Sequence, residues 1–213
     1  MRKMIMAAVS GMAVLAGSAF AQSDQSFDLE DFNSIDAGGG FSLVVIVGGE
    51  QSVRFEGDGA DFDEMEIEVR GTELRLDQES RFFSRRNNLD VTVYVTIPSL
   101  ESLDFSRGIE ADVTGLDTAR LDVDVSTGAE VELSGQCEYM SLDMSTGAVL
   151  DARELVCSEV DADTSTGAEA RIYASEEIDA SASMGAMIRV YGSPAHTNVS
   201  SSMGGSVRID RTG

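Results

Sequence analysis

Apolar and polar residues alternate along most of the chain after residue 98, a pattern typical of half-buried β-strands. A short motif, Ser-x-Gly, punctuates this alternation six times, and its glycines are Gly108, Gly128, Gly147, Gly167, Gly185 and Gly204. Successive copies lie 18 to 20 residues apart. This period is much shorter than the roughly 33 residues of two-helix repeats, and it fits one coil of a β-solenoid.

Equivalent positions in the repeats carry apolar residues. They stand three residues before each motif serine and three residues after each motif glycine: Leu103, Val123, Leu142, Ala162, Ala180 and Val199, then Ala111, Val131, Leu150, Ala170, Ile188 and Val207. Because successive side chains of a strand point to opposite faces, these positions are predicted to point inward. The sequence therefore predicts an all-β fold, a right-handed parallel β-helix or β-solenoid with coils of about 19 residues.

The motif itself is predicted to form the corner of each coil. Glycine adopts positive φ without a steric penalty, and a Ser or Thr just before it can hydrogen-bond to neighbouring backbone amides. A serine nucleophile is the alternative interpretation of the motif. Six copies, no nearby lysine and a single histidine, His196, favour the structural role.

Residues 32–98 hold strand-like segments without the motif. They are predicted to form an N-terminal β cap and the first coils, ahead of the solenoid repeats in residues 99–213. A cap is expected because an open solenoid end exposes unpaired backbone groups. No capping pattern follows the last repeat, so an open edge is predicted around residues 207–209. The arginine-rich segment 77–90 is predicted to be an exposed loop, with ligand contact as the alternative.

The first 21 residues are predicted to be a signal peptide. Arg2 and Lys3 precede an apolar stretch, and Ala19-Phe20-Ala21 offers the small-x-small pattern of a cleavage site before Gln22. The apolar stretch is too short to be a permanent membrane span. We expect an exported chain, in the periplasm, at the cell surface or secreted, with residues 22–31 as a linker and no membrane insertion after cleavage.

The charge excludes several partners and mechanisms. The chain carries 38 acidic and 15 basic residues, for a net charge of −23; removal of Arg2 and Lys3 leaves 13 arginines, no lysine and a net charge of −25. Such a chain repels nucleic acids and anionic membranes. The absence of lysine excludes Schiff-base and Ser-Lys chemistry, and a single histidine leaves little for metal or triad sites.

Cys137 and Cys157 each stand eight residues before a motif serine, so they are predicted to occupy one column on adjacent coils. Coils about 4.8 Å apart fall within reach of a disulfide. A bridge is predicted, with two reduced, stacked thiols as the alternative. Other repeats fill this column with Pro98, Thr118, Ser175 and Pro194.

An outward column stacks the carboxylates of Asp124, Asp143 and Asp163, with Asp104 on the preceding coil. Like charges directly opposite one another are unfavourable, and a hard cation relieves the repulsion through oxygen ligands. Calcium binding is therefore a hypothesis, and no other cofactor is expected. The alternative is a hydrated acidic face without metal.

A second outward column changes sign midway along the solenoid. Asp112, Glu132 and Asp151 are followed by the three arginines Arg171, Arg189 and Arg208, and Tyr173 and Tyr191 lie two residues beyond the first two arginines. Guanidinium forks suit carboxylates or phosphates on a linear glycan, and tyrosine rings offer flat surfaces to sugars. The alternative is a solubilising stripe neutralised by Glu169, Glu176 and Glu177.

Several segments resemble the auto-transporter adhesin head GIN domain family. They are Phe32-Asn33-Ser34-Ile35, a first strand of the form Gly-x-Phe-x-Leu-x-Val, the segment Ile97-Pro98-Ser99-Leu100 and the Ser-x-Gly repeats. The resemblance spans about residues 30–210 and implies an exported bacterial β-helix-like domain of the cell envelope. It carries no catalytic residues over to this chain. The chain departs from many members by lacking a lipid-attachment cysteine near its start.

These observations favour an exported, non-catalytic, adhesin-like β-solenoid that binds a glycan or protein of the cell envelope. One alternative is a polysaccharide-acting β-helix enzyme, although its carboxylates are expected in exposed columns where nothing raises one pKa above its neighbour. A second alternative is a structural module that assembles through its C-terminal edge.

Overall fold

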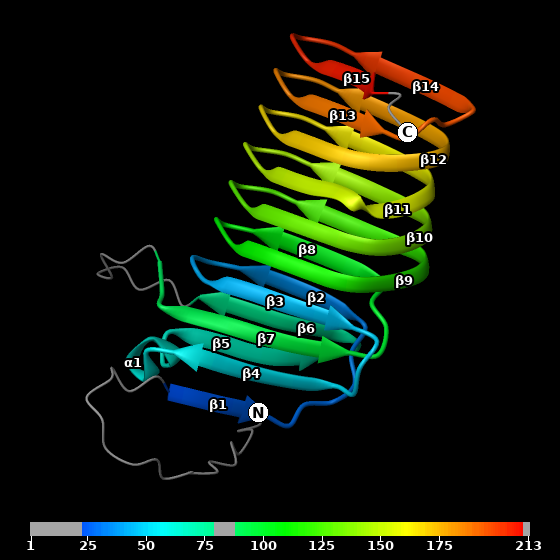
Figure 1. Ribbon diagram of the computed structural model, residues 1–213. Coiled ribbons are helices and arrows are strands. Elements are labelled where there is room, and N and C mark those ends of the chain that lie inside the picture. The colour runs from blue at the N-terminus through cyan, green and yellow to red at the C-terminus, as the bar shows by residue number, and fades with distance from the viewer. Residues whose placement is uncertain (1–22, 79–87, 211–213) are drawn as a thin grey trace, which may run out of the picture.

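The computed structural model describes residues 23–78 and 88–210, which form a β-solenoid with one short helix, α1 (Gly59–Phe62) (Figure 1). The predicted signal peptide and the arginines Arg81, Arg85 and Arg86 of the predicted loop lie outside the described residues. No helix within these ranges is long and apolar enough to cross a membrane.

Within the described ranges, fifteen strands make up one continuous sheet. In chain order they are β1 (Ser23–Phe27), β2 (Ser34–Gly38), β3 (Ser42–Val47), β4 (Ser52–Gly57), β5 (Met65–Arg70), β6 (Glu73–Gln78), β7 (Val91–Ile97), β8 (Ser102–Ser106), β9 (Glu110–Val125), β10 (Glu130–Met144), β11 (Val149–Thr164), β12 (Glu169–Ala182), β13 (Met187–Tyr191), β14 (His196–Ser201) and β15 (Ser206–Asp210). The all-β solenoid predicted from the repeat is thereby confirmed.

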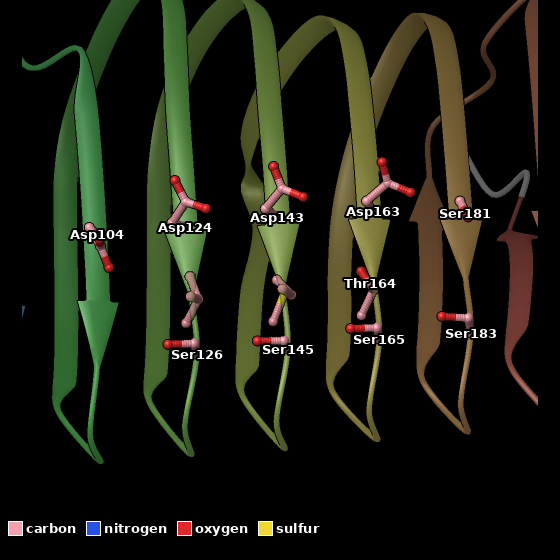
Figure 2. Close-up of a pocket in the computed structure, with 12 residues that line it drawn as sticks. Asp104, Asp124, Ser126, Asp143, Ser145, Asp163, Thr164, Ser165, Ser181 and Ser183 are labelled. Atoms are coloured by element: carbon pink, nitrogen blue, oxygen red, sulfur yellow. The ribbon is translucent and has the colours of Figure 1, made fainter.

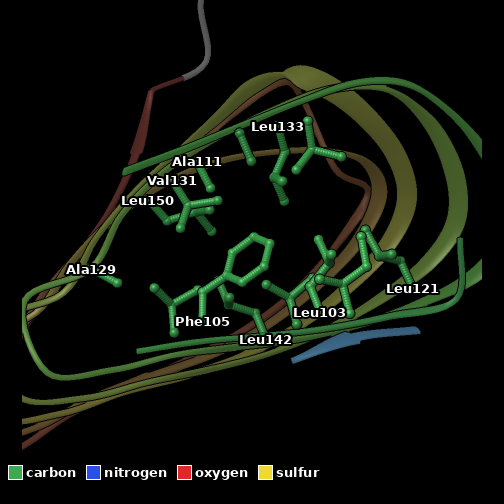
Figure 3. Packing of buried hydrophobic residues seen from close by; sticks show 14 of the residues in the cluster. Leu103, Phe105, Ala111, Leu121, Ala129, Val131, Leu133, Leu142 and Leu150 are labelled. Atoms are coloured by element: carbon green, nitrogen blue, oxygen red, sulfur yellow. The ribbon is translucent and has the colours of Figure 1, made fainter. Parts of the chain in front are cut away.

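The strands stack into two faces around a shared interior. Face A contains β5, β6, β2, β8, the C-terminal parts of β9 to β12, and β14. Face B contains β1, β4, β7, β3, the N-terminal parts of β9 to β12, β13 and β15. The chain passes from face A to face B at a tight corner and returns through a rounded end, where the long strands bend (Figure 3).

The N-terminal coils are not stacked in chain order. The coil formed by β2 and β3 lies between the coil of β6 and β7 on one side and the coil of β8 and β9 on the other. Strands β4 and β5 then pair antiparallel with β7 and β6, and β1 pairs antiparallel with β4. These antiparallel strands cover the N-terminal end, where the sequence predicts a cap (Figure 1).

The predicted inward columns form the core along most of the solenoid (Figure 3). Leu103, Val131 and Leu142 are at most 2% exposed. The last coil differs: Val199 is 46% exposed, and every residue of β14 is exposed. The difference arises because β14 has a strand neighbour on one side only within the described chain.

Each corner is a tight turn with two residues at positive φ. The sequence predicts this conformation for the glycine alone, yet in the second coil both Thr127 (φ 51°) and Gly128 (φ 73°) adopt it. The amide of Ala129 donates to the carbonyl of Ser126 at 3.2 Å, as in a type I′ turn. Gly128 donates to the carbonyl of Thr146 on the next coil at 3.1 Å. Corners are thus joined by backbone bonds, and the expected hydroxyl bonds of the motif serines are not found in the described residues.

Cys137 and Cys157 pair in register on β10 and β11 and form a disulfide, with Cα atoms 4.5 Å apart. Both are buried at the rounded end. The prediction that Ser175 belongs to their column is wrong. Ala174, rather than Ser175, lies opposite Cys157, because β11 holds extra residues at an irregularity between Ala152 and Val156.

Candidate functional site

Face B carries the predicted sign change in one straight column. Parallel register places Asp112 beside Glu132, Glu132 beside Asp151, and Asp151 beside Arg171. Arg189 and Arg208 continue the column on β13 and β15. Six coils therefore present three carboxylates followed by three guanidinium groups, about 4.8 Å apart from one coil to the next.

Tyr173 and Tyr191 lie directly beside the arginines. They are register partners on β12 and β13, and both are partly buried. The guanidinium of Arg153, on β11, lies 5.9 Å from the ring centroid of Tyr191, within cation–π range. The two tyrosines thus occupy neighbouring positions on adjacent coils, next to the column.

Part of the arginine column is paired within the chain. Arg171 lies 2.6 Å from Glu169 and 3.9 Å from Asp151, and Arg189 lies 3.6 Å from Asp210. In the alternative interpretation Glu169, Glu176 and Glu177 neutralise the stripe. Glu169 does pair with Arg171, but neither Glu176 nor Glu177 forms an ion pair with these arginines in residues 23–78 and 88–210, because both lie at the rounded end.

Other members of the column have no such partner. Arg208 is exposed and forms no ion pair with any described residue, and the same holds for Asp112 and Glu132. Asp151 is the exception among the acids. Arg153 binds it at 2.7 Å, and this hydrogen-bonded pair lowers the pKa of the Asp151 carboxyl.

The acidic half of face B is hollowed. A shallow depression of about 340 Å³ runs across β3, β9, β10 and β11. Its charged lining includes Asp112, Glu132 and Asp151, and Val44 and Val149 contribute apolar surface. Arg171, the first arginine of the column, also lines this depression, so the depression spans the point where the charge of the column changes sign.

Face A carries the predicted aspartate column, and the structure extends it. Asp104, Asp124, Asp143 and Asp163 align in register on the same outer face (Figure 2). Asp36 of β2 joins the column opposite Asp104. No spacing rule could find Asp36, since it precedes the repeats and reaches the column only through the out-of-order stacking of β2.

The aspartate column borders a groove of about 360 Å³, whose other edge carries the motif serines Ser126, Ser145, Ser165 and Ser183 (Figure 2). Partial desolvation by neighbouring coils, followed by the charges of adjacent carboxylates, raises the pKa of Asp124. Desolvation likewise raises the pKa of Asp104. The expectation that nothing raises a carboxyl pKa in these columns is therefore wrong, because stacking removes water from between the coils.

Calcium binding stays a prediction for this column. In residues 23–78 and 88–210, no three histidine, cysteine or carboxylate side chains converge closely enough to hold a metal ion. The carboxylates follow one another along a line instead of surrounding a point. Titration calorimetry with calcium tests the prediction. If calcium produces no heat of binding and no shift in melting temperature, the prediction is rejected.

Comparison with known proteins identifies the fold and family. A search of the curated proteins finds no match. Among solved structures, the chain is similar to a "putative adhesin" from Bacteroides fragilis, with 19% identity and a TM-score of 0.73, over 90% of this chain and 98% of that one. It is also similar to a "putative adhesin" from Parabacteroides merdae, with 14% identity and a TM-score of 0.52, over 89% and 96% of the chains.

A "putative lipid binding protein" from Parabacteroides distasonis has 13% identity and a TM-score of 0.51, over 89% of this chain and 97% of that one. At these identities the likeness shows a shared fold. A family model described as "Putative auto-transporter adhesin, head GIN domain" matches residues 31–194, most of the chain. The protein therefore belongs to the head GIN domain family, as the resemblance of its repeats and first strands predicts.

Proposed function

We propose that the protein is an exported, non-catalytic, adhesin-like domain that binds an acidic glycan, or an acidic protein surface, of the cell envelope. The observation that carries the proposal is the alignment of Arg171, Arg189 and Arg208 in one column, with Tyr173 and Tyr191 at neighbouring positions beside it. Planar guanidinium groups bind carboxylates and phosphates through two parallel hydrogen bonds. A row of them at coil spacing suits a linear polyanion that runs along the solenoid axis.

Export rests on the predicted signal peptide and agrees with the Cys137–Cys157 disulfide, since disulfides persist in oxidising compartments. Family membership agrees with a place at the cell surface or outside the cell. Fractionation of the source cells, with the mature N-terminus sequenced, tests both points. A cytoplasmic, uncleaved protein would contradict the proposal.

The binding test uses residues 22–213 on an immobilised uronic acid polymer, with an uncharged glucan as the matched support. Replacement of all three column arginines by Gln should abolish retention. The control replaces Arg70, Arg107 and Arg120 by Gln, which removes the same charge outside face B, on β5, at a corner and at the rounded end. Unchanged retention of the column variant, or no retention of the native chain, would reject the stripe as the binding site.

A non-catalytic role is tested in the same material. The desolvated carboxyls of Asp104 and Asp124 are the groups that an acid catalyst would use. We expect no release of reducing sugar from the polymer by the native chain. Release that disappears in the Asp124→Asn variant would assign the protein to the polysaccharide-acting enzymes instead.

The exposed strand β14 favours a second candidate, an assembly module. Its outer backbone groups have no strand partner in the described residues, and such an edge accepts an added strand. If the edge self-associates, Val199→Lys should reduce the mass measured by light scattering. An unchanged mass would remove this candidate.

A further inference from the structure

The charge column of face B matches a second copy of itself that runs in the opposite direction along the solenoid axis, because acids then face arginines. Three acidic coils are followed by three basic coils, and the sign changes between Asp151 and Arg171. We propose that two copies of the chain pair face to face through face B. The two-fold axis that relates them runs parallel to the strands and passes between Asp151 and Arg171.

Such an axis reverses the order of the coils and keeps the strand direction. Asp112 then faces the partner's Arg208, Glu132 faces the partner's Arg189, and Asp151 faces the partner's Arg171. Because a two-fold interface is isologous, each pair occurs twice. A single column thus supplies six opposed charge pairs.

The charges needed for this contact are largely available. Asp112, Glu132 and Arg208 form no ion pair within the described chain, whereas Arg189 lies 3.6 Å from Asp210 and donates a hydrogen bond to Tyr191. Asp112 and Glu132 also lie directly opposite each other in register, an unfavourable arrangement of like charges. Arginines from a second copy would relieve that repulsion.

The shape of face B agrees with its charges. The 340 Å³ hollow lies on the acidic half, where the long side chains of the partner's arginines would enter. Beside the column, Val156 is 45% exposed, and the same rotation brings the partner's Tyr173 to it. The exposed Val156 side chain would thereby pack against the partner's Tyr173.

The contact is small. Six coils of about 4.8 Å and strands of about five residues give roughly 400 to 500 Å² of flat area on each partner. Counted over both partners, the buried area is about 800 to 1,000 Å², below the roughly 1,200 Å² at which stable specific interfaces begin, so a concentration-dependent dimer in rapid exchange is expected. The net negative charge of each copy makes the two copies repel at long range. At about 0.1 M salt, charges more than about 10 Å apart are largely screened, so the attraction between the opposed charges in contact dominates.

The pairing goes beyond the proposed glycan binding and does not depend on it. Both use the arginine column, so a bound polyanion and a second copy exclude each other. If both occur, the uronic acid polymer dissociates the dimer. If glycan binding fails, the dimer still forms, so the two proposals fail separately.

Sedimentation of residues 22–213 across a concentration series at about 0.1 M salt tests the pairing. The native chain should shift from monomer to dimer. Arg189→Glu places like charges opposite each other twice and should weaken the dimer at least tenfold, as should Glu132→Arg. The double variant Glu132→Arg/Arg189→Glu restores opposite charges and should recover the native dissociation constant.

Arg70→Glu is the matched control, because it makes the same charge change on β5 of face A and should leave the dimer intact. Melting temperatures of all variants show whether the fold is retained. A native chain that stays monomeric throughout, or a double variant as weak as the single variants, would overturn the proposal. Loss of the dimer in Val199→Lys with no effect of Arg189→Glu would assign it to the β14 edge instead.

Discussion

The coils of residues 102–164 and those of residues 165–210 have nearly the same backbone but different outward chemistry. The first set carries 15 acidic residues and 3 arginines, a net charge of −12, and the second carries 5 acidic residues and 3 arginines, a net charge of −2. On face A the aspartate column ends at Asp163 and continues as Ser181, and on face B acids give way to arginines. The backbone constrains only corners and inward positions, so the outward columns are free to carry binding.

The interior changes along the same direction. One inward column reads Phe105, Val125, Met144, Thr164 and Ala182 from the acidic coils towards the C-terminus. Larger side chains bury more apolar area, and each buried side chain contributes about 1.5 to 3 kcal/mol. The acidic coils should therefore hold most of the stability, and the open C-terminal coil the least.

The largest expected effect on stability comes from a substitution in the core of the acidic coils, where the buried side chains are largest. Phe105 is fully buried, so Phe105→Ala should lower the free energy of unfolding by about 3 to 5 kcal/mol. Val199→Ala, on the 46% exposed side chain, should cost less than about 1 kcal/mol. Urea denaturation measures both. Similar losses in the two variants would show that the two ends of the solenoid are equally well packed.

The disulfide ties two of the acidic coils together and should have the next largest effect. Cys137 and Cys157 are 20 residues apart in sequence. Removing such a cross-link should cost about 3 kcal/mol, mainly by freeing the unfolded chain. The Cys137→Ala/Cys157→Ala variant should melt like the native chain treated with a reductant. A native chain whose melting temperature is insensitive to reductant would indicate free thiols.

Thr164 marks the boundary between the two sets of coils. It is 2% exposed, and its Oγ1 has no hydrogen-bond partner among the residues that the structure describes. Thr164→Val replaces the buried hydroxyl by a methyl group of similar size and should stabilise the fold by about 1 kcal/mol. The control Thr114→Val removes a hydroxyl that donates to the Val45 carbonyl at 3.4 Å, so no gain is expected there.

The smallest effect concerns pH and the aspartate column. Desolvation raises the pKa of Asp36, Asp104 and Asp124 in the folded chain, so these groups stabilise the fold when protonated and lose that contribution as pH rises through the folded pKa. Asp151, whose pKa is lowered, acts in the opposite direction. Desolvation also raises the pKa of Asp161, so four raised groups oppose one lowered group, and the melting temperature should be higher near pH 5 than at pH 7.

Asp124→Asn should reduce this pH dependence, and Ser181→Ala, the next polar column position beyond Asp163, should leave it unchanged. Differential scanning calorimetry at both pH values measures the change. A native melting temperature that falls on acidification would mean that Asp151 and the other ion-paired carboxylates dominate instead.

Much of the site follows from the repeat alone. Once the coil length is known, spacing assigns the six charged residues from Asp112 on β9 to Arg208 on β15 to one column. It assigns Cys137 and Cys157 to another column. Both follow because parallel register makes residues one period apart in sequence neighbours in space. The family resemblance agrees with this assignment through the same motifs. The misplacement of Ser175 in the cysteine column results from an irregularity in β11, which no average period can reveal.

The sequence by itself determined the solenoid, its inward columns, its corners and the order of charges along both faces, since each depends on local alternation and a regular repeat. The tertiary structure alone decided the placement of β2 and β3 between later coils, the entry of Asp36 into the aspartate column, and the pairing or freedom of each arginine. These features depend on contacts between segments far apart in the chain and on side-chain desolvation. Neither leaves a periodic trace in the sequence.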